Sequence, residues 1–440
     1  MNIYLQILLG IGVVGVVWLL PYWRIVKKTT GCSLTPTVLM NCIWTIVLLG
    51  VAFFSTINVS SRVQILMPLF WAAILAFAFS IEVYCGKTKP NIEKFDNIII
   101  RNRKTLSITF YVGLVFNVAR IIYEYQVIGD LGGGLDQLSV ESQWLRMAYL
   151  DYSRNEMTLI EQIISNILSY GATIGLIASC LLSFFDGKMW RLFVYILFSV
   201  IGAVITMSKF SFILDLCYIL SIYIIYRNIK VRRIVKKRKE KRKYTLIIAA
   251  TLSLIVLLFT IMGTQRGYES KSSNIQGVDN MIVFEGIAYT LTPYMAFQTI
   301  MDKNIDYSYG VKTFNPFFKL FGIEYKNFGS IDVGLSDTTV YTMPGVFYAD
   351  FGFVGSLLFM CLFILLATLL FRKVIENFTI SCLGIYMVIN TILLFSFFTW
   401  LGRMTIFWFF PVVLFVYDKL FIKKYDTRNS FVHNLGKRKG

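Results

Sequence analysis

The residues best suited to chemistry are basic side chains at the edges of apolar segments, namely Arg120, Lys209, Arg266 and Arg403. A guanidinium forms two parallel hydrogen bonds with a phosphate and stays charged when it is partly buried. A cluster of such groups at one membrane depth would therefore suit a lipid diphosphate. The alternative is that each side chain reaches phospholipid head groups or pairs with a carboxylate.

Acid–base chemistry in this chain would need a carboxylate or, failing that, a tyrosine or lysine. We favour Asp337, because it lies in the short polar run 336–339. Asp350 stands at the start of a predicted membrane span, beside Phe351 and Gly352, and we interpret it as a helix cap or the partner of an arginine. The remaining candidate carboxylates are Asp332, Glu285, Asp279 and Glu269.

The sequence lacks the residues that several types of catalysis require. The only histidine is His433, in a basic tail, which excludes a histidine-based triad and a histidine-ligated metal. The seven cysteines form neither a disulfide framework nor a Cys-x-x-Cys metal spacing. No phosphate-binding glycine loop lies between a strand and a helix. We therefore expect neither a metal nor a cofactor.

Composition determines the class of protein. Of 440 residues, 56% are hydrophobic and 15% are charged, whereas a soluble domain carries about 25% charged residues. We predict an all-α polytopic membrane protein. The net charge of +18 comes from basic residues that gather in short loops, which is the pattern of cytoplasmic loops. The most basic run, 227–243, has no interleaved aromatic rings for base stacking, so we expect no nucleic acid as partner.

Hydropathy predicts about 11 transmembrane helices, with the N-terminus outside and the C-terminus inside. The chain divides into spans 1–8 with their loops (1–263), an outer-face loop (264–350), spans 9–11 (351–421) and a basic cytoplasmic tail (422–440). The predicted spans are 3–20, 34–54, 63–84, 105–123, 157–185, 192–207, 210–226, 244–263, 351–371, 378–398 and 404–420.

The outer-face loop is the longest polar interval of the chain. Two of its segments, 283–297 and 314–325, are apolar and aromatic but too broken to cross a bilayer. We expect both to lie on or dip into the membrane interface, where their rings would form an aromatic belt, pack within the loop or stack on sugars. Pro293 is expected to kink or end the first segment.

The order of these features resembles the Wzy-type polymerases of O-antigen and capsular polysaccharide. The resemblance covers about residues 200–410: a Ser-Lys turn at Lys209, a basic loop, a span ending in Thr-Gln-Arg266 and a large outer loop. Its most specific part is Phe-Tyr-Ala-Asp350-Phe-Gly-Phe-Val-Gly355. The chain departs from the pattern at Lys209, where an arginine is expected and the two-pronged geometry is lost.

The resemblance implies an enzyme that joins undecaprenyl-diphosphate-linked oligosaccharide repeat units on the outer face of the bacterial cytoplasmic membrane. Arg266, Arg403, Lys209 and Arg120 would then bind the lipid diphosphate that leaves, with Asp337 and Arg266 as catalytic residues. It implies neither metal nor nucleotide. Further partners would be membrane lipids, a chain-length regulator and a flippase.

Three alternatives stay open at this point. A flippase for the same lipid-linked unit would explain the spans, but it predicts paired repeats and charges near the bilayer midplane. A polyprenyl-dependent glycosyltransferase or polysaccharide ligase would share the substrate, and a ligase would attach polymer without changing chain length. A structural membrane scaffold would need no site at all.

Overall fold

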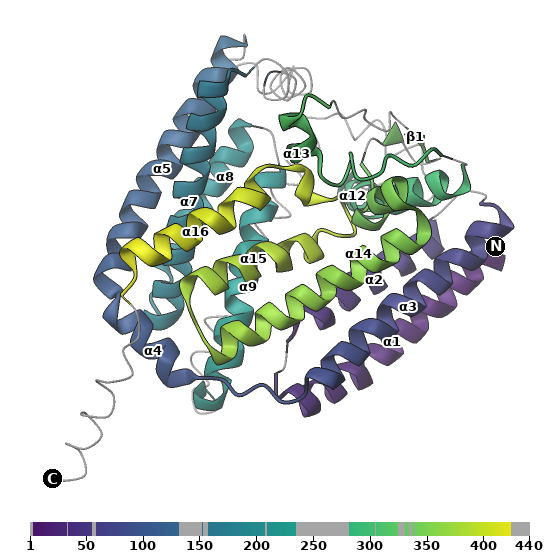
Figure 1. Ribbon diagram of the computed structural model, residues 1–440, viewed down its shortest axis with the longest axis horizontal. Helices are drawn as coiled ribbons and strands as arrows, with labels where there is room; N and C mark the ends of the chain where they lie inside the picture. The colour runs from purple at the N-terminus through teal and green to yellow at the C-terminus, as the bar shows by residue number, and fades with distance from the viewer. Residues whose placement is uncertain are drawn as a thin grey trace.

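The structure is a computed structural model, and it is almost entirely helical (Figure 1). It describes residues 3–32, 34–54, 59–131, 152, 157–206, 209–234, 281–303, 305–323, 331–333, 337–338 and 340–423. Within these ranges, the strand structure is the antiparallel pairing of β1 (Ile331–Asp332) with β2 (Asp337–Thr338). The predicted all-α class is confirmed at this level.

Helices occupy every predicted span that falls within the described residues; span 244–263 lies outside them. In the part of the chain that the structure describes, six helices (α2, α3, α5, α7, α9 and α14) are long and apolar enough to cross a membrane, and α8 and α15 are shorter apolar helices. The total of 11 spans stays a prediction. The helices are α1 Ile3–Thr30, α2 Pro36–Phe54, α3 Ser61–Cys85, α4 Ile92–Arg101, α5 Arg103–Asp130, α7 Leu159–Asp186, α8 Trp190–Ile205, α9 Lys209–Ile234, α12 Met281–Asp302, α13 Asn315–Leu320, α14 Met343–Glu376, α15 Ile380–Leu394, the 3₁₀ turn η3 Leu401–Arg403 and α16 Ile406–Phe421.

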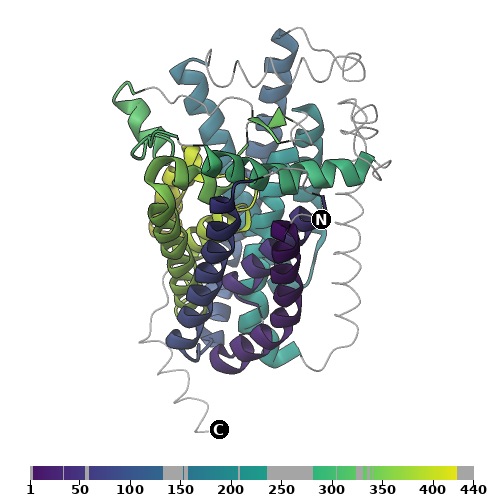
Figure 2. The same cartoon turned by 90° about the vertical axis from the view of Figure 1, so that its right-hand side faces the viewer.

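The long helices stand side by side, and α12 lies across one end of them (Figure 2). The same end carries α13 and β1, whereas α16 ends toward the opposite end, where the Lys423 N–H donates to Asn102 beside the start of α5. We call these the capped end and the basic end; α4 lies near the basic end (Figure 1). By the charge pattern of the loops, we expect the capped end to face outward.

Helix α12 bears on two predictions. Of the two outcomes expected at Pro293, the segment does not end there, because the helix continues through it. Its residues 291–298 are all buried, against α2, α3 and α14, so this part of the 283–297 segment packs inside the protein, which is one of the arrangements expected for its rings. The reason is packing: Tyr294 and Phe297 are fully buried, and their apolar burial offsets the roughly 3 kcal/mol that a proline costs inside a helix.

Helix α14 begins earlier than the predicted ninth span and is kinked where that span starts. Every residue from Met343 to Asp350 is buried, and Gly352 leaves helical geometry with φ 70° and ψ −169°. The first turn is capped by Thr342, whose Oγ1 accepts the Gly345 N–H at 3.1 Å. The kink separates a short buried helix at the capped end from the long apolar part that crosses the bundle.

We predict that Gly352→Ala destabilises the protein by about 1–3 kcal/mol, because this backbone region is essentially restricted to glycine. A Cβ here would also lie 3.0 Å from the Tyr307 hydroxyl. Thermal unfolding of the purified protein measures the effect. Gly129→Ala is the matched control, because no atom lies within 4 Å of its added Cβ; equal stability of the two variants would contradict the prediction.

The basic end is held together by a buried ion pair, which we call the Arg372 cluster (Arg372, Glu82 and Thr37). Arg372 donates to the carbonyls of Cys85 (2.5 Å) and Gly86 (2.8 Å), where α3 ends. Its Nη2 lies 4.0 Å from the buried Glu82 carboxylate, which also accepts the Thr37 hydroxyl at 2.6 Å. The cluster therefore joins α2, α3 and α14.

Candidate functional site

The turn that carries Arg403 is fixed by two indole side chains. The buried Trp400 donates its Nε1–H to the carbonyl of Thr313 at 2.8 Å. The Trp408 Nε1–H donates to the Gly402 carbonyl at 2.5 Å, and the Trp408 ring contacts those of Phe314 and Phe317. Arg403 itself is exposed. These contacts hold Arg403 beside the segment 312–317, which comes from a distant part of the chain.

Asp350, in the first part of α14, also binds the segment 312–317. Its carboxylate is fully buried and accepts the backbone N–H groups of Lys312 (3.2 Å) and Thr313 (2.5 Å). The Ser308 hydroxyl also donates to it. We had expected Asp350 to cap its helix or to pair with an arginine. The described contacts of its carboxylate include neither. It acts as an acceptor for loop amides that approach the kink in α14, because a buried backbone N–H needs a partner.

Lys312 completes this group. Its ammonium donates to the Ser308 hydroxyl at 3.0 Å, so the hydroxyl stands between the ammonium and the Asp350 carboxylate. Burial lowers the pKa of Lys312, and the negative charge of Asp350 acts in the opposite direction. Burial is the larger effect because the Lys312 side chain is half-buried, whereas the Ser308 hydroxyl separates its ammonium from the Asp350 carboxylate.

We call Arg403 and Lys312, with Ser308 and Asp350, the capped edge. Its two cations lie on segments that the Trp400–Thr313 hydrogen bond joins. The arrangement provides one exposed guanidinium and one half-buried ammonium. Cations so placed suit a phosphorylated ligand. Sequence analysis singled out Arg403 and Asp350 but missed Lys312, because nothing in Tyr309-Gly-Val-Lys312 distinguishes it from a surface lysine.

The lowered pKa of Lys312 gives a testable pH dependence. The folded protein releases this proton at a lower pH than the unfolded chain, whose lysine pKa is 10.5. Burying the ammonium therefore costs stability below the folded pKa, and the cost disappears as pH rises toward 10.5. We expect acylation of Lys312, followed by mass spectrometry, to reach its midpoint at a lower pH in the folded protein than in the protein unfolded with urea. Coincident midpoints would contradict the assignment.

The carboxylate that we favoured, Asp337, lies in β2, at the same end of the bundle as the capped edge. Its backbone forms β2, directly opposite Asp332 in β1, so the structure brings two of the candidate acids into register. Both strands lie against α12. Glu285 belongs to α12. Glu269, Asp279 and Arg266 lie outside the described residues, and the assignments made to them stay predictions.

Arg120 is committed to partners inside the bundle. Its guanidinium lies 3.9 Å from the Glu124 carboxylate and donates to Asn117 at 3.1 Å, both on α5. Asp215 on α9 accepts the Ser199 hydroxyl of α8, in the same part of the bundle. Figure 1 places α5 and β1 on opposite sides of the molecule, so Arg120 and Asp337 do not share a site. Lys209 begins α9.

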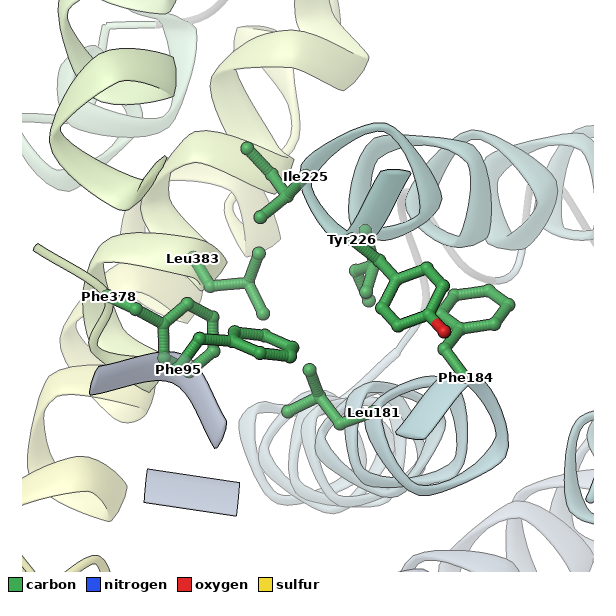
Figure 3. Close-up of a pocket in the computed structure, with 8 residues that line it drawn as sticks. Phe95, Leu181, Phe184, Ile225, Tyr226, Phe378 and Leu383 are labelled. Carbon is green, nitrogen blue, oxygen red and sulfur yellow. The ribbon is translucent and has the colours of Figure 1, made fainter. Parts of the chain in front are cut away.

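Two further places were candidates for a site. A pocket between α4, α7, α9 and α15 is lined by apolar side chains, with the Tyr226 hydroxyl as the visible polar atom (Figure 3). It offers no group for catalysis. Among the described residues, no three His, Cys, Asp or Glu side chains are grouped to hold a metal ion. Among the described residues, we therefore take the capped edge as the candidate site, because it combines an exposed guanidinium with a half-buried ammonium.

The chain matches no protein-family model, no curated protein and no solved structure. The resemblance to the Wzy-type polymerases accordingly stays a hypothesis based on the residues quoted for it. What stands independently of it is the architecture of a polytopic membrane protein and the geometry of the capped edge.

Proposed function

We propose that the chain is a polymerase of lipid-linked oligosaccharide repeat units, acting at the capped end of the bundle. The repeat units would be carried on undecaprenyl diphosphate in the bacterial cytoplasmic membrane, and the product would be an O-antigen or capsular polysaccharide. The resemblance of residues 200–410 supplies the substrate class. The capped edge supplies the place where a lipid diphosphate would bind.

One observation carries the proposal: the Trp400–Thr313 hydrogen bond and the Trp408 contacts hold the turn that carries Arg403 next to the segment that contains Lys312. A diphosphate leaving group gains negative charge as its bond to the sugar breaks. Positive groups already in place stabilise that charge without reorganisation. Arg266, predicted to lie at the start of the same loop, would add a second guanidinium.

The reaction is a glycosyl transfer. An acceptor hydroxyl oxygen attacks the anomeric carbon of the growing chain, whose bond to the diphosphate oxygen breaks. The electron pair leaves with the lipid diphosphate, and the hydroxyl proton passes to a base. We assign the base to Asp337, which the pairing of β1 with β2 sets opposite Asp332. No metal or nucleotide enters this balance.

Deletion of the gene tests the class of reaction. A polymerase predicts single repeat units in place of long chains, still attached to the final acceptor. Loss of attachment with chain length intact would instead indicate a ligase. Full-length polymer in the deletion strain, in amounts equal to the parent, would contradict the proposal. Returning the wild-type gene on a plasmid is the control.

Transport of the same lipid-linked unit is the second candidate, because ionisable residues lie inside the helical bundle. Arg120, Glu124 and Asp215 occupy α5 and α9, and such residues often mark transport pathways. A transporter predicts that the lipid-linked unit accumulates on the inner leaflet of the deletion strain. Protection of that unit from periplasmic glycosidases in spheroplasts would distinguish transport from polymerisation.

A further inference from the structure

The α13 segment exposes large apolar side chains at the capped end. Phe321 is 79% exposed, Ile323 43% and Phe317 37%. We call these three residues the α13 patch. Phe317 and Phe321 are four positions apart and lie on neighbouring turns, so they share one side of the segment. Exposed phenylalanine in such a group indicates an interaction surface.

The patch is attached to two apolar helices. Phe314 contacts the rings of Phe359 on α14 and Trp408 on α16, and Phe317 contacts Trp408 edge-on, with centroids 5.0 Å apart. Pro316, in the first turn of α13, is buried. Figure 2 shows α13 projecting sideways beyond the end of the bundle, on the side where α14 and α16 lie. The patch is therefore held over the ends of these two helices.

Below the patch, α14 and α16 expose apolar side chains of their own. Val354 (66%) and Leu358 (63%) are exposed on α14, and Phe409 and Val412 are exposed on α16. In a membrane-spanning bundle such side chains face lipid, because lipid tails solvate them. The α13 patch continues this lipid-facing surface beyond the ends of the spans. That position corresponds to the head-group region.

A lysine next to the patch also fits a position in the head-group region. Lys319 is exposed and lies between Phe317 and Phe321 in sequence. Aromatic rings with a neighbouring lysine are typical of the membrane interface, where the rings lie among the acyl–glycerol boundary and the ammonium reaches lipid phosphates. A protein partner or a sugar would need no such continuity with the lipid-facing helices.

We propose that the α13 patch inserts into the lipid leaflet at the capped end and holds the segment 305–323 at the membrane surface. This segment also contributes Lys312 to the capped edge. The lipid interface thereby fixes the height of the capped edge relative to the bilayer. The inference concerns membrane attachment and does not depend on the proposed polymerase activity.

Spin labelling in lipid vesicles tests the proposal. The native cysteines are replaced by serine, and single cysteines are introduced by Phe321→Cys, Leu358→Cys and Asp306→Cys in the full chain. Leu358 is the lipid-facing reference, and Asp306 is an exposed polar reference on the same segment. Collision of each label with oxygen and with a water-soluble nickel complex then reports its depth.

We expect the Phe321 label to collide with oxygen more, and with nickel less, than the Asp306 label, placing it between the two references. A label at Phe317 should give the same order, which guards against a local effect of one substitution. If both labels match the Asp306 label, the patch faces water and the proposal is overturned. The Phe321 label is measured in vesicles with and without anionic lipid. Equal depths show that the aromatic rings alone insert the patch, whereas insertion that requires anionic lipid shows that Lys319 contributes to it.

Discussion

Arg403→Ala is expected to lower polymer formation by about 10²–10³-fold, leaving mostly single repeat units on the acceptor. The reason is electrostatic: the variant removes the exposed guanidinium of the capped edge, while Trp400 and Trp408 still hold the turn. The charge that develops on a departing diphosphate then loses its positioned partner. Electrophoresis of the extracted polysaccharide, together with blotting for the protein in membranes, measures the effect.

Two variants serve as controls for this experiment. Arg403→Lys keeps the charge but loses the paired hydrogen bonds, so an intermediate chain length is expected. Lys373→Ala removes an exposed cation from the last turn of α14, at the other end of the bundle, and should leave polymer formation unchanged. Arg266→Ala is expected to act like Arg403→Ala. Full-length polymer from both alanine variants would refute a diphosphate site at the capped edge.

Asp350→Ala is expected to destabilise the protein by about 2–6 kcal/mol, because each buried donor left unsatisfied costs about 1–3 kcal/mol. The substitution removes the acceptor for the N–H groups of Lys312 and Thr313. The segment 305–323 would lose its attachment to the kink in α14. The fraction of protein that stays monodisperse after heating, measured by size-exclusion chromatography, reports the loss.

Asp306→Asn is the matched control, since Asp306 is exposed on the same segment and should change stability by no more than about 0.5 kcal/mol. Asp350→Asn keeps one oxygen acceptor and the shape of the side chain. Its stability should therefore fall between those of Asp350→Ala and the wild type. An Asp350→Ala protein as stable as the wild type would show that the amides find other partners.

The helices of the bundle were predictable because a long apolar run has few structures open to it in lipid. The prediction was weaker where tertiary packing decides the outcome. Pro293 has a strong local preference against a helix interior, yet burial of Tyr294 and Phe297 on either side overrides it. Helix α4 likewise falls between the predicted spans 63–84 and 105–123, where no helix was predicted, and its buried face is formed by Phe95, Ile98 and Ile99.

The candidate site was predictable only in part. Arg403 stood out because a basic residue in a tight turn between apolar runs is unusual. Lys312 did not, because its burial and its contact with Ser308 arise from the kink at Gly352 and the distant Trp400. Likewise, Arg120 drew attention as an isolated charge, but its partner Glu124 and the nearby Asp215 became apparent only in three dimensions.

The Arg372 cluster has a consequence for how the molecule can move. Two hydrogen bonds from one guanidinium tie α14 to the last carbonyls of α3, and the Asn91 N–H donates to the Ile375 carbonyl at 3.1 Å. Displacement of α14 at that end would require several buried polar contacts to break together. At the other end of the helix, the buried part before Gly352 is tied instead to segment 305–323, whose Ser308 and Tyr309 N–H groups donate to the carbonyls of Ala349 and Asp350. Any rearrangement that admits a bulky substrate is therefore expected to pivot about Arg372, and to move the helix before Gly352 together with segment 305–323.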